Sequence, residues 1–351
     1  MKYRTSMILA LGATLSVLFH GCKSDLDVLA PYKEITVVYG LLDRTDDTLW
    51  VKINKAFLGD GNALEFAQIP DSNEYTNEQF SGVIEQLDDQ GAVTNTYTIQ
   101  NTIVNRPVGI FNGPQHKMYY ILAGGGLNDD FRYRLKATAK GNVIEASTPL
   151  VNDFSIYNPT QNPNTLINFK TSGGYVPYEV KWDVARNGKR YEVSYRFHYD
   201  EVRTDNSVQS KSFTSTIGTL ISSGPVGEQV SVSLNGELFY QGVANNVQPD
   251  PNVVKRVFQG IDLLWAVAGP DLHTYLQLAS PISGIVEERP DYTNISGGYG
   301  LFSSRLFKVA PAGGDSYLTR KRLNDLSTIE LIQGQYTGNL QFCVPGELNC
   351  P

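Results

Sequence analysis

The longest regular feature of the sequence is a strict alternation of apolar and polar side chains over residues 191–199. Five aromatic or aliphatic residues alternate there with four polar or charged ones. An α-helix would spread these apolar residues around its whole surface, whereas an extended strand places all of them on one face. The segment therefore predicts a long β-strand with one face in a hydrophobic core.

Shorter runs of this kind precede the long strand and are separated by turn sequences. The predicted strands include residues 35–42, 49–53, 83–87, 93–99 and 131–137. Residues 88–91 (DDQG) have the composition of a hairpin turn between two of them. Short strands at this spacing favour an immunoglobulin-like β-sandwich over residues 31–150. Tyr133, near the start of a strand, is either the tyrosine corner of that sandwich or an ordinary core tyrosine.

A segment rich in Pro and Asn, residues 158–164 (NPTQNPN), marks a break in composition. We expect a second β-rich domain over residues 151–351, ending in a disulfide-bonded tail. Short helices are predicted over residues 236–247, 271–279 and 319–326, the first capped by Asn235 and the second beginning at Pro270. The predicted fold class is therefore mainly β: an N-terminal immunoglobulin-like β-sandwich followed by a second β-rich domain with two or three short helices.

The first 21 residues have the pattern of a signal peptide. A basic start is followed by an uncharged run over residues 7–19, which is too short for a membrane span. The run ends in a glycine and Cys22, and a small residue before a cysteine resembles a bacterial lipobox. We predict that Cys22 is lipidated and that residues 22–30 are a tether. The alternative is an ordinary secretory signal with an incidental cysteine.

Charge and composition restrict what the exported chain can do. With 29 Lys and Arg against 36 Asp and Glu, the net charge is −7, and we expect no nucleic-acid partner because that requires clustered cations. The hydrophobic fraction of 41% is sufficient for a folded core. Residues 23–27 (KSDLD), directly after Cys22, resemble the surface-export signal of Bacteroidota lipoproteins. The alternative is a solvated linker that carries no export signal.

Two further cysteines lie near the end of the chain, in the sequence CVPGELNC. We predict a disulfide between Cys343 and Cys350, because an exported chain folds in an oxidising compartment and the Pro-Gly pair turns the chain between them. A metal site is the alternative, but two thiolates without a nearby histidine would leave zinc half-coordinated. We therefore expect neither a metal nor a cofactor.

The sequence contains no motif that specifies a reaction. His116, His198 and His273 are each isolated, and neither a GxSxG nucleophile elbow nor a GxxxxGK phosphate loop occurs. The sequence does not decide whether a carboxylate pair for glycoside hydrolysis is present, because the tertiary structure sets the distance between the two carboxylates. The acidic turn at residues 43–47 (DRTDD) is either a calcium site or, as we favour, a solvated turn. We predict no catalytic residue and no enzymatic activity.

The most distinctive segment is residues 289–305, where three glycines lie within four positions between aromatic residues. Glycine permits positive φ and close backbone approach. The segment is therefore either a binding loop or a tight turn leading into a strand over residues 301–309, and we favour the turn. The candidate residues for both roles are Tyr292, Asn294, Gly297, Gly298, Gly300, Phe302 and Arg305.

Four parts of the sequence together resemble a family of Bacteroidota outer-membrane lipoproteins. They are the lipobox-like leader and residues 37–42 (VVYGLL), 71–75 (DSNEY) and 292–302 (YTNISGGYGLF). Members of that family carry a domain of unknown function and are often encoded beside TonB-dependent receptors. The resemblance implies an outer-membrane location and a receptor as partner. It implies no reaction, because no catalytic residues are established for the family.

The leading functional hypothesis is an outer-membrane lipoprotein, exposed at the cell surface, that acts in nutrient uptake. It would serve as a noncovalent accessory or ligand-binding partner of a TonB-dependent receptor and would reach the membrane through its lipid. The sequence does not identify the ligand. Two alternatives stay open: a secreted hydrolase of glycans or peptides, which needs converging catalytic groups, and a structural or adhesive surface module.

The predicted lipid anchor can be tested by one substitution. Cys22→Ala should release the protein from the membrane fraction, because the lipid on this side chain is the anchor that the sequence predicts. Cell fractionation followed by immunoblotting measures the distribution, and Ser24→Ala is the matched control that should remain with the membranes. Retention of the Cys22→Ala protein in the membrane fraction would show the prediction to be wrong.

Overall fold

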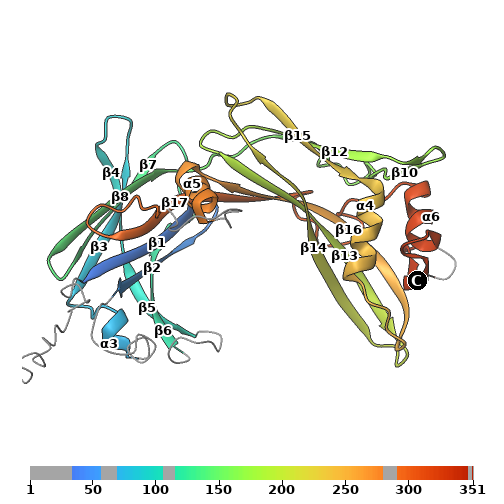
Figure 1. Ribbon diagram of the computed structural model, residues 1–351, viewed down its shortest axis with the longest axis horizontal. Helices are drawn as coiled ribbons and strands as arrows, with labels where there is room; N and C mark the ends of the chain where they lie inside the picture. The colour runs from blue at the N-terminus through green and yellow to red at the C-terminus, as the bar shows by residue number, and fades with distance from the viewer. Residues whose placement is uncertain (1–33, 57–68, 106–114, 280–290, 347–349, 351) are drawn as a thin grey trace, which may run out of the picture.

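The structure is a computed structural model that describes residues 34–56, 69–105, 115–279, 291–346 and 350. The predicted signal peptide, Cys22 and the tether lie outside these residues. The described chain forms two lobes along one long axis (Figure 1), and its fold is mainly β, as predicted. Within the described part of the chain, every helix is too short or too polar to cross a lipid bilayer.

The first lobe is a β-sandwich. Its elements are β1 (Ile35–Asp43), β2 (Thr48–Ala56), α3 (Pro70–Asn73), β3 (Phe80–Leu87), β4 (Val93–Thr98), β5 (Gln100–Asn105), β6 (Gln115–Leu122), β7 (Arg132–Ala139) and β8 (Asn142–Pro149). One sheet has the order β1-β2-β6-β5 and the other has the order β4-β3-β7-β8. Both sheets contribute to one hydrophobic core. These are the strand orders of an immunoglobulin domain (ABED against CFG with one added edge strand), which confirms the predicted sandwich.

Tyr133 occupies the tyrosine-corner position of this sandwich. Its side chain is fully buried, and its hydroxyl oxygen lies 3.0 Å from the carbonyl oxygen of Asn128, five residues upstream. The same hydroxyl lies 3.1 Å from the side-chain oxygen of Gln86 on β3. Burial raises the pKa of Tyr133, so the hydroxyl keeps its single proton, which lies within reach of both acceptors. Of the two interpretations of this residue, the structure supports the tyrosine corner.

The second lobe packs a long sheet against a smaller one. Its strands are β9 (Ile156–Asn158), β10 (Lys170–Thr171), β11 (Gly174–Tyr175), β12 (Pro177–Asp183), β13 (Arg190–Arg203), β14 (Val208–Ile221), β15 (Gln229–Asn235), β16 (Val253–Ala268), β17 (Tyr299–Ala310) and β18 (Phe342–Cys343). The long alternation of the sequence is β13, and its apolar residues lie in the core as predicted. Strands β14, β13, β16 and β17 are neighbours in one sheet, and β15, β12 and β9 form the other.

The helices of the second half are α4 (Gly236–Asn246), α5 (Pro270–Ala279) and α6 (Asp325–Gln333), followed by the 3₁₀ turn η1 (Gly338–Leu340). The start of α4 is confirmed, because the side-chain oxygen of Asn235 accepts a hydrogen bond from the backbone of Glu237 at 2.8 Å. Helix α5 begins at Pro270, also as predicted.

The prediction of a helix over residues 319–326 is wrong. Lys321 and Leu323 are held in extended bridges to Ile261 and Ile167. The helix starts only after them, where the side chain of Asn324 caps α6 by accepting a hydrogen bond from the backbone of Ser327 at 3.1 Å. Tertiary pairing therefore overrides the local helix signal in this segment.

Strand β17 belongs to both lobes. Its first part pairs in parallel with β1, and its second part pairs in antiparallel with β16. Phe302 lies in the core of the first lobe, whereas Leu306 and Ala310 lie in the core of the second. Figure 1 shows the strand running between the lobes. The first lobe thus includes residues from far beyond the boundary expected at residue 150.

The tail of the chain is tied to the second lobe. Strand β18 pairs in parallel with β16, and the sulfur atoms of Cys343 and Cys350 lie 2.12 Å apart, the separation of a bonded pair. The side chain of Cys350 is almost fully buried. The two cysteines are therefore placed as the predicted disulfide requires.

The tyrosine corner generates a stability prediction. Tyr133→Phe should lower the free energy of unfolding by about 1 kcal/mol, because it removes a buried hydroxyl and leaves the Asn128 carbonyl without this donor. Urea denaturation measures the change. Tyr157→Phe is the matched control, since the hydroxyl of Tyr157 binds Asp183 at the exposed surface. Equal effects of the two substitutions would contradict the role of Tyr133.

The disulfide generates a second stability prediction. Replacing Cys343 and Cys350 together by Ser should lower the free energy of unfolding by about 2–3 kcal/mol, because the bond closes a short loop and restricts the unfolded chain. Urea denaturation measures this loss. Intact mass after thiol alkylation, with and without reductant, checks the bond itself; two alkylated thiols in native, unreduced protein would contradict it.

Candidate functional site

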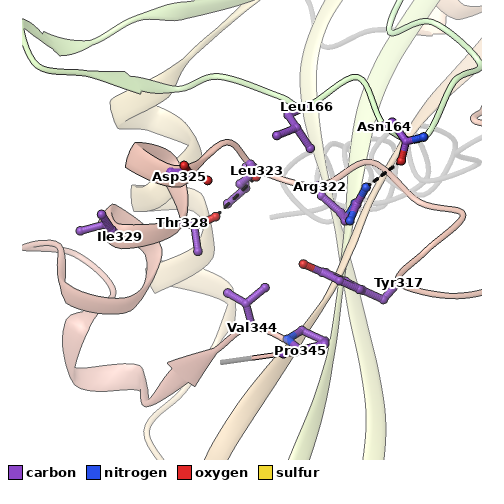
Figure 2. A pocket seen from close by; sticks show the side chains of 11 residues that line it. Asn164, Leu166, Tyr317, Arg322, Leu323, Asp325, Thr328, Ile329, Val344 and Pro345 are labelled. Carbon is purple, nitrogen blue, oxygen red and sulfur yellow. Dashed lines mark hydrogen bonds between the residues drawn. The ribbon is translucent and has the colours of Figure 1, made fainter. Parts of the chain in front are cut away.

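An open groove of about 540 Å³ lies in the second lobe beside α6 (Figure 2). Three segments that are far apart in sequence form it: the loop before β10, the chain from the end of β17 into α6, and the tail after β18. We call it the terminal groove. Its lining residues are Asn164, Leu166, Tyr317, Arg322, Leu323, Asp325, Thr328, Ile329, Val344, Pro345 and Gly346.

The loop on one side of the terminal groove is held by backbone pairing and by a buried lysine. The backbone N–H of Ile167 donates to the carbonyl of Arg322 at 2.8 Å. The ammonium group of Lys321 donates to the carbonyls of Asn162 and Thr165 at 2.5 and 3.3 Å. Burial lowers the pKa of Lys321 to about 8, so the charged form holds this loop below that pH.

Arg322 supplies the main polar group of the groove. Its Nη2 donates to the side-chain oxygen of Asn164 at 3.0 Å, as the dashed line in Figure 2 marks. Its guanidinium carbon lies 5.7 Å from the ring centre of Tyr317, within reach of a cation–π interaction. The two contacts orient the guanidinium between an amide and an aromatic ring.

The remaining wall is apolar and partly open to solvent. Leu166 is 40% exposed and Ile329, on α6, is 50% exposed. Val344 and Pro345 face them across the groove (Figure 2) and lie inside the loop that Cys343 and Cys350 close. The groove as a whole exposes more polar than apolar surface, so this combination suits noncovalent binding of a group that has both an apolar and a polar part.

The glycine-rich segment lies away from this groove, at the edge of the first lobe. The side-chain amide of Asn294 pairs with the backbone of Phe302, donating at 2.8 Å and accepting at 2.9 Å. The hydroxyl of Tyr292 donates to the carboxylate of Asp271 on α5 at 2.5 Å. These side chains are therefore committed to contacts within the protein.

The glycines of this segment allow close backbone contact with both sheets of the sandwich. A Cβ atom at Gly300 (φ 116°) would overlap the carbonyl of Val38 on β1, and one at Gly297 (φ 72°) would overlap that of Val143 on β8. Gly298 likewise lies against β1, where a Cβ would be 2.8 Å from the carbonyl oxygen of Thr36. The segment closes one edge of the sandwich and leads directly into β17, which begins at Tyr299.

Arg305, the last residue of the predicted set, is separated from the others. It pairs with Asp43 of β1 on one side and with Ala268 of β16 on the other. It thus lies at the junction of the lobes, where a second and smaller cavity opens.

His198 belongs to a charged cluster that the sequence did not reveal. Its Nε2 lies 2.7 Å from a carboxylate oxygen of Asp262, which also accepts a hydrogen bond from Arg196 at 2.9 Å. Arg320 lies 3.9 Å from the other carboxylate oxygen. Burial raises the pKa of Asp262, but the hydrogen bonds from His198 and Arg196 more than offset this effect and lower it overall. Asp262 is therefore a buried anion that joins three basic groups.

The sequence did contain a signal for this cluster. Asp262 is an acidic residue in the middle of an otherwise apolar run, and Arg196, His198 and Asp200 share the polar face of β13. An isolated charge in a buried strand requires a partner, and the partners stand on the neighbouring strand. The pairing of β13 with β16 could not be read from either segment alone.

Two of the three carboxylates in the acidic turn at residues 43–47 accept hydrogen bonds within the protein. Asp43 is buried; one of its oxygens accepts hydrogen bonds from the backbone and hydroxyl of Thr45, and the other accepts one from the backbone of Phe307 at 3.2 Å. Asp47 accepts a hydrogen bond from the backbone of Gly125 at 3.0 Å. Within the described ranges, no group of three or more acidic, His or Cys side chains is arranged to hold a metal ion.

Comparison with known proteins gives little further information. No protein-family model matches the sequence. No curated protein matches it either. Among solved structures, the chain is similar to the C-terminal globular domain of the oligosaccharyltransferase from Pyrococcus abyssi, with 13% identity and a TM-score of 0.25. The match covers 65% of this chain and 45% of that one. A similarity at this level carries no argument about function.

Proposed function

We propose that this protein is a lipid-anchored protein of the outer membrane, exposed at the cell surface, that works noncovalently with a TonB-dependent receptor in nutrient uptake. The predicted signal peptide directly before Cys22 and the acidic residues after Cys22 support the location. The resemblance to receptor-associated lipoproteins supports the partner. The structural observation that carries the proposal is the terminal groove, an open surface with an apolar wall and oriented polar groups.

The position of the groove suits a tethered binding protein. The described chain begins at Glu34 in the first lobe, whereas α6 and the groove lie at the opposite end of the long axis (Figure 1). An anchor at Cys22 would hold the molecule through its first lobe and leave the second lobe accessible to a partner. Fixation of the groove wall by the disulfide and by Lys321 reduces the conformational entropy lost on binding.

One observation favours a second candidate, the hydrolase. His198 lies beside a buried carboxylate, which is the arrangement that orients a general base. The same carboxylate, however, also accepts a hydrogen bond from Arg196 and lies close to Arg320. A carboxylate shared with two guanidinium groups serves mainly to balance charge, so we rank noncovalent binding first.

Co-purification tests the proposed function. Protein isolated in mild detergent should bring a TonB-dependent receptor with it, and Ile329→Glu should reduce the recovered receptor at least tenfold, because it places a charge on the apolar wall of the groove. A tenfold loss corresponds to about 1.4 kcal/mol. Mass spectrometry of the eluate identifies and quantifies the receptor.

A matched control separates the groove from the surface in general. Ile103, on β5 of the first lobe, is 53% exposed, similar to Ile329. Ile103→Glu should leave the recovered receptor unchanged. Repeated recovery of the wild-type protein alone would contradict the partner, and equal losses in both variants would contradict the role of the groove.

A further inference from the structure

A smaller cavity of about 260 Å³ lies where the two lobes meet. Strands β1, β13, β16 and β17 and helix α5 line it, so it draws on both lobes. We call it the junction pocket. The residues that define it are Arg190, Ala266, Ala268, Leu276, Arg305 and Phe307.

Strand register explains why a hollow forms here. Ala268 of β16 pairs with Arg190 of β13 on one side and with Arg305 of β17 on the other. One row further along, Ala266 is paired on its β17 side with Phe307. Paired residues point to the same face of a sheet. The two alanines therefore form a low floor, and the long side chains of the neighbouring strands rise as walls on either side.

The pocket is largely apolar. Leu272 and Leu276 reach it from α5, and Leu41 reaches it from β1. Leu276 is 39% exposed and Phe307 is 55% exposed. Helix α5 is fixed over β17 because the backbone N–H of Leu272 donates to the hydroxyl of Ser303 at 3.1 Å. The apolar wall is thus held in place without being covered.

Two guanidinium groups stand over this floor without a carboxylate partner. Neither Arg190 nor Arg305 forms an ion pair with any residue that the structure describes. The guanidinium of Arg305 lies 4.9 Å from the ring centre of Phe307, and its Nε is buried without a hydrogen-bond acceptor. A buried donor without an acceptor is destabilising, so an acceptor placed here would be favoured.

The acidic groups near the pocket do not supply that acceptor. Asp43, opposite Arg305 in the register, gives its oxygens to Thr45 and to the backbone of Phe307. Glu192 is paired with Ala266 of the floor, is exposed and makes no ion pair within the described chain. Asp46 interacts electrostatically with Arg305 but forms no ion pair with it in the described chain. The floor at Ala268 itself lies between the two guanidinium groups of Arg190 and Arg305.

We infer that the junction pocket binds a small organic anion, a carboxylate with a short apolar body. The carboxylate would lie over Ala268, where Arg190 and Arg305 can both donate to it, since guanidinium matches a carboxylate in two-point hydrogen bonding. The apolar body would extend over Ala266 against Phe307 and Leu276. The volume restricts the ligand to a few carbon atoms beyond its head group. This site is separate from the terminal groove and does not rest on the proposed receptor.

Three ligands with the same five-carbon alkyl chain test the inference on the purified chain, without any receptor. Hexanoate should bind saturably in isothermal titration calorimetry. Pentan-1-ol should bind at least tenfold more weakly, and pentylamine should not bind, because only the head group differs. Equal binding of hexanoate and pentan-1-ol, or no saturable binding of hexanoate, would overturn the inference.

Variants locate the binding site. Arg190→Gln and Arg305→Gln should each weaken hexanoate binding at least tenfold, and Ala268→Leu should abolish it by filling the floor. Arg132→Gln is the matched control, because Arg132 is an exposed arginine of β7 without an ion pair in the described chain. Circular dichroism checks that each variant is folded. If Arg305→Gln does not fold, Arg190→Gln decides: affinity equal to that of Arg132→Gln would overturn the inference.

Discussion

The pairing of β17 with two different strands is the constraint on which the rest of this structure depends. Along twelve residues the strand passes from parallel pairing with β1 to antiparallel pairing with β16, and Arg305 takes part in both. Its apolar side chains enter first one core and then the other. The long sheet therefore runs through both lobes. The lobes are joined both by the covalent chain and by backbone hydrogen bonds between strands.

Several otherwise unrelated features follow from this shared strand. The glycine-rich segment before it must pass between β1 and β8, where side chains larger than hydrogen would overlap backbone carbonyls. Helix α5 lies on β17 through Ser303 and Ser304, whose hydroxyl and carbonyl groups accept hydrogen bonds from its first turn and from the residue before it. The junction pocket forms because the strand change brings long side chains beside the small residues of β16.

The terminal groove depends on a different principle. None of its three segments has regular secondary structure along its whole length. Each is held by a specific contact: the buried ammonium group of Lys321, the Asn324 cap of α6, and the cysteine pair at the tail. Fixed loops on a rigid β scaffold are a common way to build a binding surface. In this protein the scaffold is β16, which pairs with β13, β17 and β18.

The sequence by itself determined the elements whose signals are local. Alternation at period two specified β13, Asn235 and Pro270 fixed the starts of α4 and α5, and the turn chemistry defined the hairpin at residues 88–91, because each depends on neighbours within a few residues. Only the tertiary structure decided the rest. Lys321 and Leu323 became extended through bridges to Ile261 of β16 and to Ile167 in the loop before β10, the side chain of Asp262 contacts that of His198 on a neighbouring strand, and β17 joined both lobes. These outcomes depend on which strands become neighbours, and strand pairing is set by the burial of whole faces, which no single segment of sequence contains.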